Sequence, residues 1–261
     1  MCPLPHTQRR NGRDHIFLFT HDEGACWAPT VLNTSIWLTH WGRSELNHTC
    51  NTAFIGDRYD QEHITWKQPQ GWLHYTRGHP CYTPGKDLVV PSFKSHLHYR
   101  HSALVGVPAK ARDIFLYFKG DVGKGRFPNS SRGLRQAIYK LGLAYKDNAE
   151  TRVWVGTSGD IPGDYSEHLA RSKFCLVAPG DGWSARMEDA MLHGCVPVII
   201  MDSVHAVFES ILQVEDFSIR LAQADVPRII EILKVRLARC WALLNYAVYG
   251  VHCFSGPSLE G

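Results

Sequence analysis

One segment, residues 172–200, limits most strongly what this chain can fold into; it reads SKFCLVAPGDGWSARMEDAMLHGCVPVII. Its apolar runs KFCLVAP and VPVII are typical of strands that are buried on both faces. Between them lie a polar glycine loop and a helical stretch, which Ser184 is expected to cap and Gly194 to end. This order predicts a right-handed parallel crossover. The chain is therefore expected to contain an α/β fold built on a parallel sheet.

The loop and helix of this segment carry polar side chains where open parallel sheets bind ligands, beyond the carboxyl ends of the strands. A helix start offers free backbone N–H groups, and Arg186 adds a planar guanidinium; both suit a phosphate. Asp189 lies on the same helical face and could accept the hydroxyls of a ribose. The pattern predicts a pocket for a nucleotide diphosphate, although a surface helix with an Arg–Asp pair would show the same spacing. Glu188 is expected to be solvated.

Four blocks of the sequence, in order, resemble the exostosin family of glycosyltransferases. The family's carboxyl-terminal signature combines S-x-FCL-x-P-x-G, S-x-R, an acidic residue before Ala, and GC-[IV]-PV, and residues 172–198 match it. Three earlier blocks also match: GRDHIFLFTHDEG, KDLVVP, and RDIFLYFKG followed by RGLRQAI. Because the matches cover most of the chain, the resemblance is more specific than any single motif.

The resemblance implies a GT-B-like α/β fold, in which two Rossmann-like lobes flank a central cleft. A shortened amino-terminal, acceptor-side lobe is expected over residues 1–105, and a nucleotide-sugar-binding lobe over residues 106–261. The first lobe is expected to be incomplete, because family members carry a long region, including a strand, before the GRDH block. A missing strand would expose the edge of a sheet.

Family members transfer a sugar from a UDP-sugar to a glycan hydroxyl with inversion at the anomeric carbon. The resemblance therefore implies an inverting glycosyltransferase that acts on a glycan or glycoprotein. Direct displacement requires a base near the acceptor and stabilisation of the departing diphosphate. Basic side chains would take the place of a metal ion, so that neither a metal nor another cofactor is expected. The expected donor-binding residues are Lys119, Gly120, Arg135, Ser184, Arg186 and Asp189.

The base is expected from the first lobe, where charged residues flank the predicted strand HIFLFT. Asp22 lies beyond the carboxyl end of this strand, where cleft residues belong, and is the first choice. His15 is the second choice, and Asp14, which precedes the strand, is expected to be structural. A different outcome stays open: a catalytically inactive exostosin-like protein that binds glycan or a partner transferase.

The composition excludes several other classes. A net charge of +3 without a basic run gives no support for a nucleic-acid partner. Fifteen histidines are scattered without HExxH or paired Cys/His spacing, so a metal site is not expected. The absence of a G-x-G-x-x-G with a following acidic residue argues against a dehydrogenase. Related polymerases work as pairs, which favours a homo- or hetero-oligomer with related transferases.

Compartment signals in the sequence are mixed. There is no apolar run of membrane-spanning length, and no signal peptide is expected here, since the first residues, MCPLPHTQRRNGRDH, are polar. The resemblance implies the lumenal face of the Golgi, membrane-associated in the family. Glycosylation sequons at Asn33, Asn47 and Asn129 agree with a secretory compartment.

The eight cysteines are compatible with an oxidising lumen. Cys175 and Cys195 are expected on or beside adjacent strands and could pair, but we favour them as small buried hydrophobic residues. Cys50 and Cys81 are better disulfide candidates because their surroundings are polar and loop-like.

Further elements are expected from hydrophobic periodicity and breaker residues. Helical patterns are expected over residues 29–42, 132–143, 164–171 and 226–244. Buried strands are expected over residues 15–20, 87–93, 113–120, 152–156 and 217–221.

Overall fold

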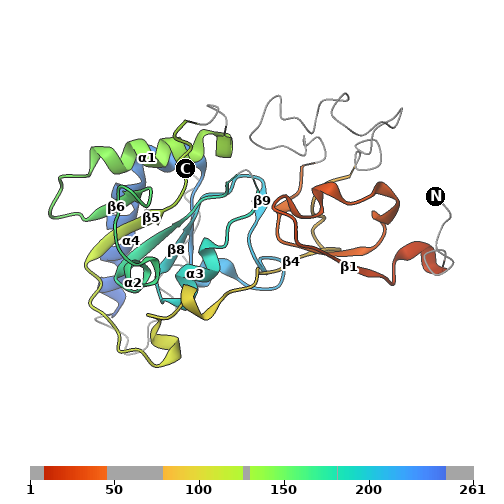
Figure 1. Ribbon diagram of the computed structural model, residues 1–261, viewed down its shortest axis with the longest axis horizontal. Coiled ribbons are helices and arrows are strands. Elements are labelled where there is room, and N and C mark those ends of the chain that lie inside the picture. Colours follow the sequence, from red (N-terminus) through yellow and green to blue (C-terminus); the bar gives the residue numbers. More distant parts are fainter. Residues whose placement is uncertain (1–8, 46–78, 126–129, 181, 245–261) are drawn as a thin grey trace.

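The chain folds into an α/β structure with two parallel sheets (Figure 1). The computed structural model describes residues 9–45, 79–125, 130–180 and 182–244. The larger sheet has five strands in the order β10-β8-β7-β5-β6, all parallel. Its strands are β5 (Ile114–Lys119), β6 (Val153–Gly156), β7 (Ser172–Val177), β8 (Val196–Ile199) and β10 (Ile219–Arg220). This sheet confirms the α/β fold class.

Helices cover both faces of the five-stranded sheet. On one face, Ile138 of α1 (Leu134–Ala144) and Leu233 of α4 (Ile229–Leu244) pack in a cluster with Leu116 and Phe174 of the sheet. On the other face, α2 (Tyr165–Ala170) and α3 (Arg186–Leu192) contribute Leu169 and Ala190 to a cluster with Tyr117 and Cys175. Both faces are buried, which explains why these strands have continuous apolar sequences.

The predicted crossover is formed by β7, α3 and β8, whose two strands pair in parallel. Gly194 ends α3 as expected, with the left-handed φ of 62° that favours glycine there. The prediction that Ser184 caps the helix was wrong. Ala185 occupies the N-cap position without a side-chain bond, and the Ser184 hydroxyl instead accepts from Arg186 Nη1 at 3.2 Å.

The smaller sheet has three parallel strands in the order β1-β2-β4: β1 (Ile16–Phe19), β2 (Ile36–Thr39) and β4 (Leu88–Val89). The helical prediction for residues 29–42 was wrong, because only a 3-10 turn forms at Thr30–Leu32 before β2 begins. In β2 the buried residues Trp37 and Thr39 alternate with partly exposed ones, the period of a strand.

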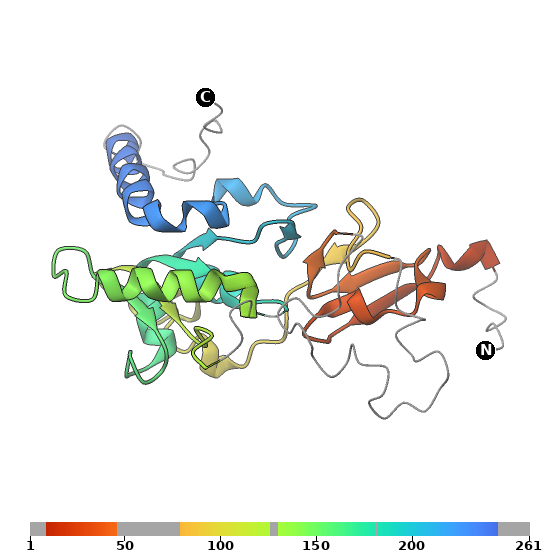
Figure 2. The ribbon, with the colours of Figure 1, turned by 90° about the horizontal axis from the view of Figure 1, so that it is seen from above.

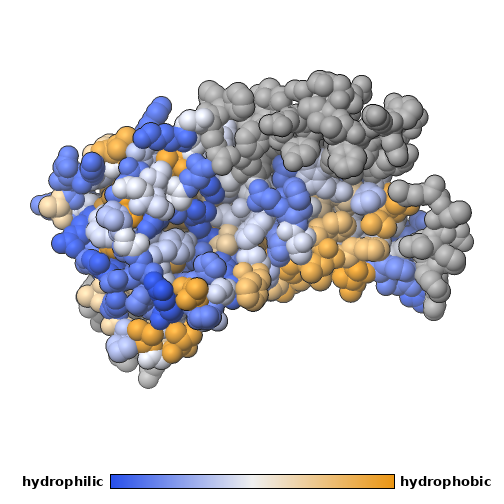
Figure 3. All heavy atoms as spheres, viewed as in Figure 1, coloured by the Kyte–Doolittle hydropathy of each residue, from blue (hydrophilic) through white to orange (hydrophobic). Residues whose placement is uncertain are grey.

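Strand β1 lies at one edge of the three described strands of this sheet. The prediction that this strand is buried was wrong. Ile16 and Leu18 are 63% and 59% exposed, while Phe17 and Phe19 pack in the cluster of Trp37 on the opposite face. Figure 3 shows apolar residues at the surface over this part of the molecule. The strand therefore buries only one face.

The two sheets are joined side by side, as Figure 2 shows from above. A two-stranded antiparallel ribbon connects them, made of β3 (Gly42–Arg43) and β9 (Val204–His205). Beneath it, Trp41 packs in one apolar cluster with Met187 and Ile199. The carboxyl ends of strands from both sheets thus lie near the same junction.

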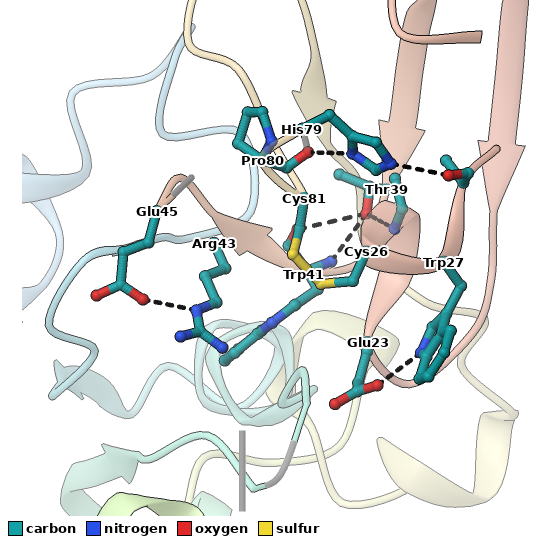
Figure 4. The surroundings of a disulfide bond; sticks show 12 residues. Glu23, Cys26, Trp27, Thr39, Trp41, Arg43, Glu45, His79, Pro80 and Cys81 are labelled. Carbon is teal, nitrogen blue, oxygen red and sulfur yellow. Dashed lines mark hydrogen bonds and ion pairs between the residues drawn. A yellow bond between two sulfur atoms is a disulfide. The ribbon is translucent and has the colours of Figure 1, made fainter. Parts of the chain in front are cut away.

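Disulfide bonds brace the junction and the larger sheet. Cys26 pairs with Cys81, so Cys81 forms a disulfide as expected (Figure 4); Cys50 lies outside the described residues. Cys175 pairs with Cys195, which overturns the preference for two free hydrophobic residues. Residues on or next to neighbouring parallel strands come close enough to be bridged.

Candidate active site

The candidate site lies at the carboxyl edge of the five-stranded sheet. Lys119 is the last residue of β5, Gly120 follows it, and Arg186 begins α3. Arg186 Nη2 donates to the Lys119 carbonyl oxygen at 3.2 Å, and Arg186 Nη1 donates to the Ser184 hydroxyl at 3.2 Å. The structure therefore brings together four of the predicted donor-binding residues.

A fifth predicted residue, Arg135 of α1, reaches the same place through an aromatic ring. The guanidinium carbons of Arg186 and Arg135 lie 4.6 and 5.7 Å from the centre of the Phe118 ring. Arg135 also donates to the carbonyl oxygens of Asp121 and Ala178, at 3.2 Å each. Stacking on a ring holds a guanidinium in place and leaves its planar edge for an anion.

Glycines allow the backbone to approach these guanidiniums. A Cβ atom on Gly120 would lie 2.1 Å from Arg186 Nη2, and one on Gly180 would lie 3.2 Å from Arg135 Nη2. Side chains at these positions would displace the arginines or the loops. Gly120 and Gly180 therefore leave the space that the two guanidiniums occupy.

Two side chains of this edge have buried donors without acceptors. Arg186 Nε and Gln136 Nε2 have no hydrogen-bond partner among the described residues. A buried N–H group without an acceptor costs free energy. A bound anion or polar ligand would satisfy such donors, so the edge is suited to a phosphate group.

Asp189, the predicted ribose ligand, is 5% exposed and already accepts two hydrogen bonds. Its Oδ1 accepts from Lys94 Nζ at 2.6 Å, and its Oδ2 accepts from the Tyr165 hydroxyl at 3.0 Å. Lys94 Nζ also donates to the Ala185 carbonyl oxygen at 2.9 Å. Tyr165 and Arg186 line one small crevice, and the Tyr165 hydroxyl links this crevice to Asp189.

The expectation of a solvated Glu188 was wrong. Both of its carboxylate oxygens are buried, beside the backbone N–H groups of Ser92 and of Glu188 itself. Burial raises the pKa of this carboxyl above its usual value, with the nearby Asp189 adding to the effect. The side chain lies on the inner side of α3 because the segment that carries Lys94 covers the helix.

The first-choice base, Asp22, lies beside the loop that carries Ser184. Its carbonyl oxygen accepts from the Trp183 N–H at 2.9 Å, and a Cβ atom on Gly182 would lie 2.2 Å from that oxygen. His15 lies before β1, at the opposite end of the strand, and bonds to Asp14 at 3.0 Å. Of the two choices, only Asp22 is brought to the candidate site.

Sequence reasoning missed Phe118, Tyr165 and Lys94. Phe118 could have been predicted as a site residue, because it directly precedes Lys119 at the end of a predicted strand. Lys94 comes from the segment after β4, far from α3 in the sequence. No local sequence pattern indicates its contact with Asp189.

Neither a metal-binding cluster nor a membrane-spanning helix is found in the described part of the chain. No group of three or more His, Cys, Asp or Glu side chains is arranged to hold a metal ion there. No described helix has the length and apolar character needed to cross a membrane.

Comparisons with known proteins identify the family. A family model, the exostosin GT47 domain, matches residues 3–235. The chain is 30% identical over 236 residues to a "Probable glucuronosyltransferase" of Oryza sativa subsp. japonica, covering 88% of this chain and 48% of that protein. It is 29% identical over 270 residues to "Probable beta-1,4-xylosyltransferase IRX10L" of Arabidopsis thaliana, covering 98% of this chain and 57% of that protein.

The chain thus spans about half the length of the curated relatives it matches. Its matched region includes both parallel sheets and the candidate site. The chain belongs to the exostosin GT47 family of glycosyltransferases.

Proposed function

We propose that this chain acts as an inverting glycosyltransferase, which moves a sugar from a UDP-sugar to a hydroxyl of a glycan or glycoprotein. The observation that carries the proposal is the pair of guanidiniums, Arg135 and Arg186, that share the Phe118 ring at the carboxyl edge of a parallel sheet. Ligands of open parallel sheets bind at this edge. Family membership adds the reaction class.

The proposed architecture is GT-B, with residues 1–105 as the acceptor-side lobe and residues 106–261 as the donor lobe. Two separate parallel sheets support it, as does the convergence of their carboxyl ends near the β3–β9 ribbon. In this arrangement the donor binds to the five-stranded sheet and the base comes from the three-stranded one.

The donor's diphosphate would lie on Lys119, Arg135 and Arg186. When the bond between the anomeric carbon and the diphosphate breaks, negative charge develops on the departing phosphate oxygens. Fixed guanidiniums stabilise that charge without a metal ion, because they are already oriented before the reaction. Asp189 remains the candidate for the ribose, since each carboxylate oxygen retains a lone pair beside the hydrogen bond it accepts.

Asp22 would act as the base. Its loop contacts Gly182 and Trp183 of the donor side, so the exposed Asp22 carboxylate lies beside the donor loop, where an acceptor hydroxyl would approach. The carboxylate would take the hydroxyl proton while the oxygen attacks from the face opposite the diphosphate. Configuration at the anomeric carbon is inverted by this displacement.

The test combines donor binding with turnover. Wild-type protein should bind UDP in calorimetry and slowly hydrolyse one donor from a panel of UDP-sugars. Asp22→Asn should reduce turnover by roughly a hundredfold or more, the contribution typical of a general base, while UDP affinity is unchanged. His15→Asn is the matched control and should retain activity.

Full turnover in Asp22→Asn would exclude Asp22 as the base. UDP binding without turnover of any donor would favour the second candidate, an inactive family member that binds glycan or a partner transferase. The exposed apolar face at Ile16 and Leu18 is the observation in favour of that candidate, since it could serve as a contact surface.

We also propose a Golgi-lumenal location for the protein. The disulfides Cys26–Cys81 and Cys175–Cys195 support an oxidising compartment. Association with a second copy or a related transferase stays a prediction.

A further inference from the structure

One glycosylation sequon of the chain, residues 33–35, lies within the described structure and takes no part in the candidate active site. Its asparagine, Asn33, directly follows the 3-10 turn Thr30–Leu32, shortly before β2 begins. The other sequons, at Asn47 and Asn129, lie outside the described residues. Of the three, only Asn33 has surroundings that the described residues define.

The folded structure makes no use of the Asn33 side chain. This side chain is partly exposed, and its amide forms no hydrogen bond to another described residue. The turn is closed by the backbone instead, since the Asn33 N–H donates to the Thr30 carbonyl oxygen at 3.0 Å. A substituent on the Asn33 amide therefore breaks no hydrogen bond of the described fold.

The two residues that follow Asn33 anchor the sequon to its neighbours. Thr34 Oγ1 donates to the Asn11 carbonyl oxygen at 2.5 Å, and the Ser35 N–H donates to the Leu32 carbonyl oxygen at 2.9 Å. Ser35 supplies the hydroxyl that the sequon requires. Although Ser35 is only 2% exposed, a sequon is recognised in the extended chain before folding, so this burial does not prevent modification.

The sequon lies at the amino end of the smaller sheet, away from the candidate active site. There, the Ile36 N–H donates to the His15 carbonyl oxygen at 3.0 Å, where β1 and β2 begin to pair. Asp22 and the β3–β9 ribbon lie beyond the carboxyl ends of these strands. A glycan on Asn33 would therefore leave the carboxyl edge of both sheets open.

Exposed apolar side chains lie around this amino end. Val31, in the turn before Asn33, is 76% exposed, and Ile16, which pairs with Ile36, is 63% exposed. Strand β1 is also the edge of the three described strands of its sheet. An apolar strand edge promotes association with other chains unless something covers it. The strand is only about 13 Å long, at roughly 3.3 Å per residue, so a branched oligosaccharide can cover it.

We propose that Asn33 carries an N-linked oligosaccharide, and that this glycan shields the apolar corner formed by Val31 and Ile16. The oligosaccharide comes from a lipid-linked diphosphate. The bond from its anomeric carbon to the diphosphate oxygen breaks, Asn33 Nδ2 forms the new bond to that carbon, one Nδ2 proton passes to a base, and the lipid diphosphate leaves. The inference rests on the proposed lumenal location, which the disulfides support.

Peptide mapping tests the site in the full chain, secreted from a eukaryotic cell behind an added signal peptide. After reduction, trypsin cleaves behind Arg13 and Arg43 and releases residues 14–43, in which Asn33 is the only asparagine. Treatment with peptide-N-glycosidase in heavy-oxygen water should convert Asn33 into a labelled aspartate. Asn33→Gln and Ser35→Ala should each abolish the label. Ser35→Thr is the matched control, because it keeps the sequon and should retain the label.

Light scattering over a concentration series tests the shielding. Asn33→Gln should associate at a lower protein concentration than the glycosylated wild type, because the apolar corner is then uncovered. Adding Val31→Ser and Ile16→Thr to this variant should reverse the shift. Equal association of Asn33→Gln and the wild type would overturn the shielding.

An unlabelled Asn33 in secreted protein with an intact Cys26–Cys81 bond would overturn the inference, because that protein has folded in the right compartment. If Asn33→Gln is not secreted, Ser35→Ala decides, since it keeps Asn33 and removes the sequon. Free Cys26 and Cys81 thiols in the chain isolated from its own cells would contradict the proposed location, which is a different result.

Discussion

The two ends of the five-stranded sheet both carry arginines, but use them differently. At the amino end, Arg112 donates to the carbonyl oxygens of Ser172 and His193, at 2.6 and 2.7 Å. Arg152 and Arg171 at that end both donate to the Asp113 carboxylate, each at 2.6 Å. All three arginines donate to acceptors within the fold, so their role is structural.

At the carboxyl end, Arg132 and Arg186 lie over the rings of Trp41 and Phe118, and neither pairs with a described carboxylate. Each keeps a buried donor atom without an acceptor. The comparison teaches that arginine alone does not mark a ligand site. An arginine that is oriented by rings and carbonyls, and that keeps a buried donor without an acceptor, is a candidate for one.

The largest effect is expected from the amino end. Arg112→Met removes two hydrogen bonds from a charged donor to backbone carbonyls, which lowers the free energy of unfolding by about 3 kcal/mol. Denaturant unfolding measures this loss. UDP affinity of the folded variant should be unchanged, and a clear loss of affinity would break the division between the two ends.

The second effect is on binding. Arg186→Ala should weaken UDP binding at least tenfold in calorimetry, about 1.4 kcal/mol, because the fixed cation of the diphosphate site is lost. The free energy of unfolding should change by less than about 1 kcal/mol, since the two hydrogen bonds of this side chain to described residues are long. An unchanged dissociation constant would remove Arg186 from the site.

The smallest expected effect is a pH dependence of stability at the amino end of the sheet. The hydrogen bond from Arg171 holds the pKa of Asp113 at about 2, below its usual value of 3.8. A depressed pKa means that the stabilisation is present above pH 3.8 and is lost as the pH falls through about 2. The wild type should therefore be more stable than Asp113→Asn above pH 3.8, and this difference in the free energy of unfolding should shrink as the pH falls towards 2. The loss should be modest, because the ion pair is partly exposed. An equal pH slope in both proteins would contradict it.

Much of the larger sheet could be predicted from the sequence, because its strands are buried on both faces and have continuous apolar runs. Residues 36–39 were missed for the opposite reason: this strand is short and half exposed, and the neighbouring apolar residues imitate a helical period. Cys26 and Cys81 are 55 residues apart, and no local pattern states which cysteines meet.

The site was predictable in part for a similar reason. Lys119, Arg135 and Arg186 each follow or approach the end of a predicted parallel strand, and such ends meet at one edge. The contact of Lys94 with Asp189 spans 95 residues and depends on how the first sheet docks. The contact of Arg132 with the Trp41 ring likewise depends on tertiary structure, which alone places the two residues together.

Gly182 has a consequence for the whole reaction. It is pressed against Asp22 so closely that even a methyl group would meet the Asp22 carbonyl carbon at 2.5 Å. This residue therefore works as a spacer of minimal thickness, and in the proposed reaction it sets how near the Asp22 carboxylate can come to the donor. The segments that follow β1 and β7 therefore meet at a point where a hydrogen atom is the largest side chain that fits.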